Sequence, residues 1–149
     1  MKIDETNIEI IKHLRDGRKS FGAIAEALSI TENTVRSRVN KLMEEGILEI
    51  AGLVDPESLP GHRMIIIGIK LSTVELVRKG YELTSLRGVV SVSVVTGRYD
   101  LIVQVLLDEN NGFGLLEFFT KELSKIDEIK EVETFVVYQG YNLRVPYIL

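Results

Sequence analysis

The segment at residues 31–46, TENTVRSRVNKLMEEG, carries the kinds of side chain that proteins use to contact nucleic acids. Val35, Val39 and Leu42 recur at i, i+4 and i+7, which predicts a helix with one buried face. The opposite face and its flanks then carry amide, hydroxyl and cationic groups, on Asn33, Thr34, Arg36, Ser37, Asn40 and Lys41. Amides and hydroxyls can bind base edges, and cations can pair with phosphates. The sequence therefore predicts a DNA-contacting face on this helix.

The polarity of that face and the position of Arg38 leave alternatives open. Arg38 lies beside the buried stripe, so it either braces the helix or reaches a phosphate, and we do not expect it to read a base. An outward helix face is also normally polar without any nucleic acid. The pattern alone therefore does not decide between a DNA-binding face and an ordinary solvated one.

Two further helices are predicted before this segment. The first begins after Asp4 and stops near Gly17, and its apolar stripe is made of Ile8, Ile10, Ile11 and Leu14. Ser20 is placed to cap a second, short helix, and Thr31 is placed to cap the third. A short helix, a tight turn and a helix with this outer face describe a helix-turn-helix. After Gly46, the weakly alternating run ILEIAGLVD predicts a strand that leads out of the domain.

A second group of chemically capable residues lies in the stretch VVTGRYDLIV, residues 94–103. Two apolar runs are joined there by a turn that contains Gly97, Arg98, Tyr99 and Asp100. A reverse turn needs only a glycine and one Asn or Asp. A structural role is open for each residue: Gly97 for a positive φ, Asp100 for a turn cap or a pair with Arg98, and Tyr99 for packing.

From Met64 onward the apolar period changes from helical to two, which indicates strands. Ser72 and Glu75 have capping-box spacing and predict a helix that runs to about Leu86. Val90, Val92 and Val94 are expected to share one face of the first hairpin strand. A second helix, NNGFGLLEFFTKEL, is expected to turn four apolar side chains inward: Phe113, Leu116, Phe119 and Leu123. A final strand, EVETFVVYQ, completes a βαββαβ, ferredoxin-like order.

The sheet should have apolar side chains on both faces, although two helices can cover only one. Ile66 stands beside Ile67, and Ile102 stands beside Val103. An exposed apolar patch of this kind is a liability in a monomer, so we expect the second face to be buried against another copy in a two-fold dimer. The alternative is that the segment YNLRVPYIL, residues 141–149, covers it.

The composition excludes several classes of function. An apolar content of 45% with 27% charged residues indicates a soluble globular chain, and we expect a cytoplasmic protein. The most apolar run, Met64 to Ile69, is too short to span a bilayer, so no membrane partner is expected. The absence of cysteine excludes disulfides and thiolate chemistry, and only His13 and His62 supply imidazole. We therefore expect no metal site, no cofactor and no catalytic residues.

Both halves of the chain resemble the Lrp/AsnC family, also called feast/famine regulators. The resemblance rests on IDETNIEIIKHLRDGRKSFGAIAEAL with ITENTVRSRVNKLMEEGIL, and on the βαββαβ order with VVTGRYDLIVQV. It implies a winged helix-turn-helix domain that binds double-stranded DNA at an imperfect palindrome. It also implies a ferredoxin-like domain that binds a small effector, typically an amino acid, and assembles the chain into homodimers and often octamers. The fold class is thus α+β.

The resemblance also implies positions for the effector site and for the domain boundaries. Gly97, Tyr99 and Asp100 fall on the family's hairpin motif, and Thr134 and Val136 fall in its ligand-response region. Asp100 would hold the effector's ammonium group, with Arg98 or backbone amides on its carboxylate. We expect the DNA-binding domain at 1–54, a linker at 55–62 and the effector and oligomerisation domain at 63–149.

Several positions depart from the family pattern. Asn7 stands where a second acid is usual, and Ser37 stands where a second arginine is common, which lowers the positive charge of the recognition helix. The segment YQGYNLRVPYIL is longer and more apolar than the family's usual charged ending, and we expect it to pack on a neighbouring subunit.

Two other functions compete with a DNA-binding regulator. Relatives with the same two-domain plan resemble sirohaem decarboxylases, which use basic and histidine residues around a tetrapyrrole. Here the second half has only His62, which is better explained as an exposed linker residue than as a catalytic group. The remaining alternative is an effector-sensing module that no longer binds DNA.

Overall fold

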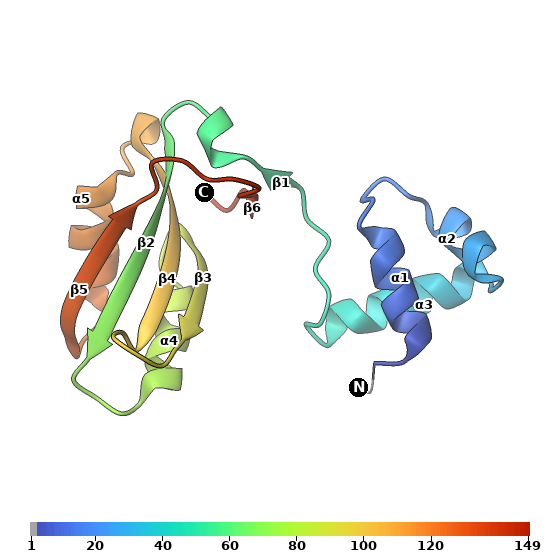
Figure 1. Cartoon of the computed structure of the whole chain (residues 1–149), viewed down its shortest axis with the longest axis horizontal. Helices are drawn as coiled ribbons and strands as arrows, with labels where there is room; N and C mark the ends of the chain where they lie inside the picture. Colours follow the sequence, from blue (N-terminus) through green and yellow to red (C-terminus); the bar gives the residue numbers. More distant parts are fainter. Residues whose placement is uncertain (1–2) are drawn as a thin grey trace. The chain divides into compact units, whose positions relative to one another are not determined.

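The computed structural model describes residues 3–149, and the chain divides into two compact units between Ala51 and Gly52. The first unit is helical, and the second combines a four-stranded antiparallel sheet with helices (Figure 1). The α+β fold class predicted from the sequence is therefore confirmed. Within residues 3–149, no helix is long and apolar enough to cross a membrane.

The first unit contains three helices, each opened by a side-chain cap. They are α1 (Glu5–Leu14), α2 (Phe21–Leu28) and α3 (Glu32–Glu44). Ser20 accepts a hydrogen bond from the amide of Ala23, and Thr31 accepts one from the amide of Thr34. Both predicted caps are confirmed. They fix where α2 and α3 begin and hence which residues of α3 face outward.

The core of the first unit confirms the predicted inward face of α3. Val35, Val39 and Leu42 are fully buried, and Val35 and Val39 pack with Ile10 and Ile24. One predicted member of the α1 stripe is wrong: Ile8 is 44% exposed. On a helix, residue 8 lies on nearly the opposite side from residue 10, and Asn7 takes the buried position instead.

The second unit has the predicted ferredoxin-like order. Its sheet, in the order β3-β4-β2-β5, is made of β2 (His62–Leu71), β3 (Val89–Val94), β4 (Leu101–Asp108) and β5 (Ile129–Val136). The helices α4 (Leu76–Thr84) and α5 (Leu115–Glu117) lie on one side of the sheet (Figure 1). After α5, the chain continues as a π-helix at Phe118–Glu122 and a 3-10 turn at Leu123–Lys125.

The π-helical turn corrects the predicted inward face of the second helix. Phe113 and Leu123 are buried as expected, but Leu116 is 69% exposed, and Phe118 is fully buried in its place. The wider turn places Phe118 and Leu123, five residues apart, on the same side. Phe119 is only partly buried at the edge of the core.

A bulge corrects the predicted face of β3. The register of β3 against β4 shifts between Val89 and Ser91. Because an extra residue reverses the side on which the following side chains point, Val89 and Val92 pack in the helix-covered core. Val90 packs with the cluster of Met64 and Leu106 on the other face. The expectation that Val90 and Val92 share a face is therefore wrong.

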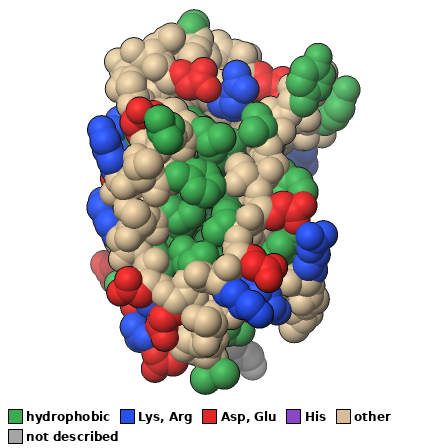
Figure 2. Space-filling model, turned by 90° about the vertical axis from the view of Figure 1, so that its left-hand side faces the viewer, with side chains coloured by type: hydrophobic (Ala, Val, Ile, Leu, Met, Phe, Trp, Pro, Cys, Tyr) green, Lys and Arg blue, Asp and Glu red, His purple; other side chains and the backbone are tan. Residues whose placement is uncertain are grey.

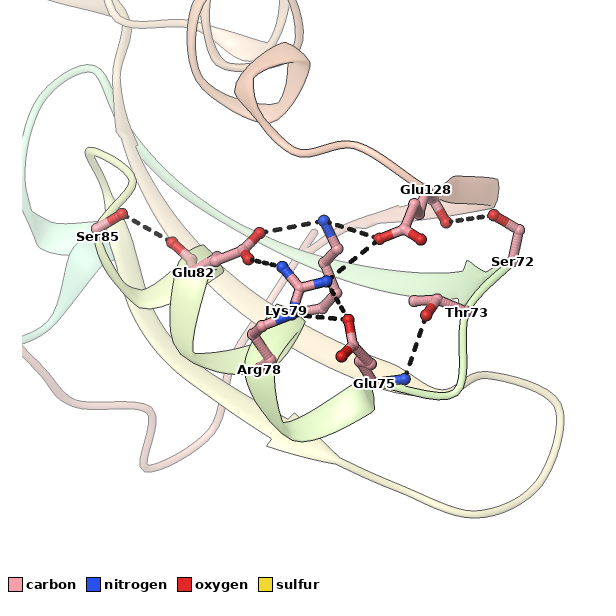
Figure 3. Close-up of polar contacts among 8 residues, drawn as sticks. All are labelled: Ser72, Thr73, Glu75, Arg78, Lys79, Glu82, Ser85 and Glu128. Atoms are coloured by element: carbon pink, nitrogen blue, oxygen red, sulfur yellow. Dashed lines mark hydrogen bonds and ion pairs between the residues drawn. The ribbon is translucent and has the colours of Figure 1, made fainter.

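The capping box predicted at Ser72 and Glu75 is also wrong. The Ser72 hydroxyl donates to the carbonyl of Glu128, and no side chain caps α4. In Figure 3, Ser72 turns toward Glu128, which directly precedes β5. Lys79 and Arg78 of α4 both point toward the carboxylates of Glu82 and Glu128. Lys79 is 3% exposed and lies 3.2 Å from carboxylate oxygens of both Glu82 and Glu128. This ion cluster ties α4 to the turn before β5.

The last described segment folds back onto the second unit. The strand expected after Gly46 forms only at β1 (Leu53–Val54), which pairs with β6 (Val145–Pro146). Val145 is 3% exposed and packs with Met64 and Leu106 on the face of the sheet away from the helices. Part of that face is thus covered by the chain itself, as the sequence alternative proposed. Pro56–Ser58, within the predicted linker, forms a 3-10 turn.

Candidate DNA and effector sites

The outer face of α3 is an exposed polar ridge. Asn33, Ser37 and Lys41 follow one another at steps of four residues and are all exposed, as are Arg36 and Asn40 on one flank. Shallow hollows of about 610 and 600 Å³ lie on either side of α3, and both are lined by Asn33, Ser37 and Lys41. Thr34 and Arg38 line only the first hollow, and Arg36 and Asn40 only the second. The structure therefore brings all seven predicted DNA-contacting residues onto this surface.

The ion pair that holds Arg36 is one that a DNA phosphate could replace. Its guanidinium lies 2.7 Å from a carboxylate oxygen of Glu32 and 5.3 Å from the centroid of the Phe21 ring. Both side chains of the ion pair are more than half exposed, so the pair is well solvated and weak. The contact with the ring helps to hold the guanidinium at the exposed surface beside α3.

Arg38 is engaged inside the first unit. One of its terminal nitrogens donates to both carboxylate oxygens of Asp4, at 2.9 and 2.7 Å, and to the side-chain oxygen of buried Asn7 at 2.9 Å. The hydrogen bond from Arg38 is the main reason that the pKa of Asp4 is lowered. Asp4 also caps α1. Arg38 therefore braces α3 against the start of α1, which is the first of the two roles considered from the sequence.

The turn between β3 and β4 folds back over the sheet. Gly97 has φ of +113°, a conformation that favours glycine. The ring of Tyr99 lies against Gly68 of β2 so closely that a Cβ built there would come within 2.8 Å of it. Gly68 thus leaves the space in which Tyr99 packs, and sequence reasoning missed this pairing because the two residues are far apart in the chain.

Asp100 anchors this turn to β2. One carboxylate oxygen accepts a hydrogen bond from the amide of Leu71 at 2.8 Å, and the other lies 3.3 Å from the ammonium of Lys70. The amide of Asp100 donates to the carbonyl of Ile69. These contacts lower the pKa of Asp100, chiefly through the hydrogen bond from Leu71. The geometry gives Asp100 a role in holding the turn in place.

A hollow of about 370 Å³ lies beside Tyr99. It is lined by Arg98, Tyr99, Glu131, Val132 and Glu133. Arg98 is 78% exposed, and its guanidinium lies 3.3 Å from a Glu133 carboxylate oxygen. The same Glu133 oxygen and the Tyr99 hydroxyl are buried and make no hydrogen bond within residues 3–149. The hollow therefore offers a cation, a carboxylate and an unsatisfied hydroxyl to a small polar ligand.

The other predicted ligand residues do not line this hollow. Glu133 pairs with Gly68, whereas Thr134 pairs with Ile67, and neighbouring residues of a strand point to opposite faces. Thr134 and Val136 therefore lie on the face away from Tyr99. Val136 instead borders a separate hollow of about 550 Å³. The register of β5 against β2 would have identified Glu133, but sequence spacing alone does not give that register.

His62 is not the exposed linker residue that the sequence indicated. It begins β2, its side chain is 10% exposed, and its Nε2 lies 3.3 Å from the Tyr147 hydroxyl and 3.7 Å from an oxygen of buried Asp108. Within the described residues no group of three or more histidine or acidic side chains is arranged to hold a metal. The contacts of His62 with Tyr147 and Asp108 hold the 141–149 segment in place.

Two family models match the chain in the regions just described. A winged helix-turn-helix DNA-binding model matches residues 3–49, and the Lrp/AsnC ligand binding domain matches residues 64–145. The helix-turn-helix prediction and the ligand-binding class of the second unit are therefore confirmed at the level of the domains.

Individual relatives agree with these models. An HTH-type transcriptional regulator of Pyrococcus horikoshii, PH0140, is 30% identical over 92% of this chain and 87% of its own. Escherichia coli AsnC is 26% identical, with a TM-score of 0.70 over 97% of both chains. A regulator from Neisseria meningitidis, NMB0573, solved in complex with L-Met, shares the fold at 20% identity, with a TM-score of 0.69 over 99% of this chain and 96% of its own. The named relatives are transcriptional regulators, and none of these matches indicates an enzyme family.

Proposed function

Because this chain belongs to the Lrp/AsnC family of DNA-binding transcriptional regulators, we propose that the outer ridge of α3 reads its operator. The observation that carries this proposal is the exposed ridge of Asn33, Ser37 and Lys41, flanked by Arg36 and Asn40. Asn and Ser can bind base edges, and Arg36 and Lys41 can neutralise phosphates. Thr34 sits at the start of the ridge, and Arg38 sets its orientation from within the unit.

A two-fold dimer would present two copies of this ridge to the DNA. Half-sites would then lie about one helical turn, ~34 Å, apart, so the operator is an imperfect palindrome. Apolar surface supports self-association: hydrophobic side chains gather along the side of the second unit that carries β5 and α5 (Figure 2). Phe135 of β5, which pairs with Ile66 on the face away from the helices, is 45% exposed. Surfaces of this kind usually mark contacts with a partner, here a second copy and further copies up to an octamer.

Fluorescence anisotropy tests the DNA-binding proposal. The probe is DNA from upstream of this protein's own gene, with scrambled DNA as the control, at two salt concentrations. We expect saturable binding that prefers the upstream fragment and weakens steeply with salt. Equal, weak binding to both fragments would count against an operator upstream of the gene. If duplexes selected from a random pool also bound no better than scrambled DNA, operator reading by α3 would be refuted.

We further propose that the hollow beside Tyr99 binds the effector and that the effector is an amino acid. Arg98 would pair with its carboxylate, Glu133 with its ammonium, and the Tyr99 hydroxyl would complete the contacts. Gly97 leaves the turn open to backbone approach. The L-Met complex of NMB0573, a protein of the same fold, supports an amino acid as the ligand class. In this arrangement Asp100 positions the turn, and Thr134 and Val136 support β5 from its other face.

Thermal shift measurements with each of the twenty amino acids test the effector proposal. We expect one or a few of them to raise the melting temperature, because a ligand that binds only the native state stabilises it. Glu133→Gln should abolish the shift, whereas Asp127→Asn, an exposed carboxylate outside the hollow, should leave it intact. A shift that survives in Glu133→Gln would place the effector elsewhere.

A further inference from the structure

The path between the two units is short. The chain is still held by the first unit at Leu48, whose amide donates to the carbonyl of Leu42 and whose side chain packs on the first core. The first contact of the chain with the fold of the second unit is at Leu53, where β1 begins. Only residues 49–52 lie between these two points, and none of them belongs to a helix or strand.

The attachment of the chain to the second unit at Leu53 depends on residues 144–147. In the β1–β6 ladder, Leu53 pairs with Pro146 and Val54 pairs with Val145. Proline has no amide hydrogen, so this two-residue ladder has few hydrogen bonds of its own. Burial does not hold Leu53 either, because its side chain is 60% exposed. β1 is therefore held by its pairing with β6 and by the side chain of Val54, which packs with Val145 in the cluster of Met64 and Leu106.

Val145 and two flanking side chains contribute to the anchor of β6, and Leu143 and Leu149 pack beside the same cluster. Val145 is 3% exposed among Met64, Leu106 and Val54. The Arg144 guanidinium lies 3.1 Å from a carboxylate oxygen of Asp55, directly after β1. The Tyr147 hydroxyl lies 3.3 Å from Nε2 of His62. The ion pair is partly exposed, with 49% of the Arg144 side chain and 31% of the Asp55 side chain accessible, so solvent weakens it and buried Val145 is the principal anchor.

We propose that β6 acts as a clamp that keeps the tether at four residues and thereby fixes the half-site spacing that a dimer can bind. The proposal rests on the function proposed above. Four extended residues span at most about 14 Å. If β1 is released, the next buried residue is Pro56, and a tether of residues 49–55 would span up to about 25 Å. A longer tether lowers the effective concentration of the second helix-turn-helix at one spacing, by about twofold from its length alone, and admits other spacings.

Selection from a random-sequence duplex pool tests this proposal with the full-length protein. Wild-type protein should recover one inverted repeat with a single half-site spacing. Val145→Asp, which places a charge at the buried anchor, should recover the same half-site sequence over a broad range of spacings. The control is Tyr141→Asp, which introduces the same charge in the same segment at a side chain that is 83% exposed, and it should keep the single spacing. A purely structural role for β6 would not alter spacing while leaving the half-site unchanged.

Hydrogen exchange of the peptide that covers residues 49–56 provides the second readout. We expect exchange at least about tenfold faster in Val145→Asp than in wild type or Tyr141→Asp. If Val145→Asp does not fold, the double variant Arg144→Ala/Tyr147→Phe removes the two peripheral contacts without touching the core and should shift both readouts in the same direction. A single, unchanged spacing in a folded variant whose 49–56 peptide exchanges freely would overturn the clamp. Failure of the wild-type protein to recover any half-site would instead refute the proposed DNA-binding face.

Discussion

The ridge of α3 and the turn between β3 and β4 are both rich in polar residues, but their charged groups are used differently. On α3, one charged residue of the predicted set, Arg38, is committed to Asp4 and Asn7, and the remaining set stays exposed apart from Thr34, which is half-buried. In the turn, Asp100 is committed to Leu71 and Lys70, and its position determines where Arg98 and Tyr99 lie.

This difference shows what each region demands of its residues. A helix directs side chains by its own period, so the DNA-facing ridge needs only one brace to set its orientation. An irregular turn has no period, and its shape must come from contacts with distant residues such as Gly68 and Leu71. Substitutions at the bracing positions should therefore impair the turn more than the ridge.

The substitution Gly68→Ala should have the largest effect. A small effect would mean that contacts with distant residues do not set the shape of the turn. The new Cβ would lie 2.8 Å from ring atoms of Tyr99, and that ring must move or the sheet must shift. Overpacking of this kind costs roughly 1–3 kcal/mol of unfolding free energy. Urea denaturation would measure the loss, and the amino-acid thermal shift should disappear. Gly17→Ala, where a Cβ meets nothing within 4 Å, is the control. A normal effector response in Gly68→Ala would show that Tyr99 is not part of the site.

Two arginine substitutions on α3 distinguish a residue that contacts DNA from one that positions the helix. Arg36→Ala should weaken specific DNA binding by about 1–3 kcal/mol if Arg36 contacts a base, or reduce the salt slope by about 1 if it contacts a phosphate. Asn40→Ala should weaken specific binding by a similar amount.

Arg38→Ala should lower the melting temperature of the first unit while leaving the salt slope unchanged. Anisotropy titrations at several salt concentrations distinguish these outcomes, and an unchanged affinity in both Arg36→Ala and Asn40→Ala would mean that the ridge is wrongly assigned.

Sequence reasoning was accurate for α2 and α3, where one element fixes its own geometry, but on α1 it failed at Ile8, which the helical period itself places opposite Ile10. The caps at Ser20 and Thr31 and the inward face of α3 follow from local hydrogen bonding and helical period, and all are confirmed. The errors at Val90, Leu116 and Ser72 arose where a bulge, a π-turn or a distant carbonyl changed the local pattern. Glu133 was missed for the same kind of reason, because it joins the turn only through strand register.

The acid dependence of Asp100 gives a prediction of intermediate size. Its pKa is lowered in the folded state, so its contribution to stability is present above the ordinary aspartate value and is lost as the pH falls through the lowered one. Asp100→Asn should therefore be less stable than wild type near neutral pH, and the difference should shrink on acidification below about pH 4. Denaturant midpoints measured between pH 2 and 7, on the order of six points, would reveal this convergence. A constant difference across the range would exclude the carboxylate as the anchor.

The smallest expected effect is a gain at Ser37. Ser37→Arg adds one cation to the exposed centre of the ridge, and each additional phosphate contact steepens the salt dependence by about 0.9 in the log–log slope. Affinity for scrambled DNA should rise, because phosphate contacts carry no sequence information. The effector response should stay as in wild type. No change in either DNA would indicate that residue 37 does not face the backbone of the duplex.

Amide TROSY spectra of the labelled protein, recorded during a titration with the upstream DNA fragment, test the central claim most directly. We predict that chemical-shift changes concentrate on Asn33, Arg36, Ser37, Asn40 and Lys41, with Arg38 changing less and the 97–100 turn unaffected until an amino acid is added. Changes that bypass α3, or that appear first at the turn, would contradict the assignment of DNA reading to α3 and of effector binding to the hollow beside Tyr99.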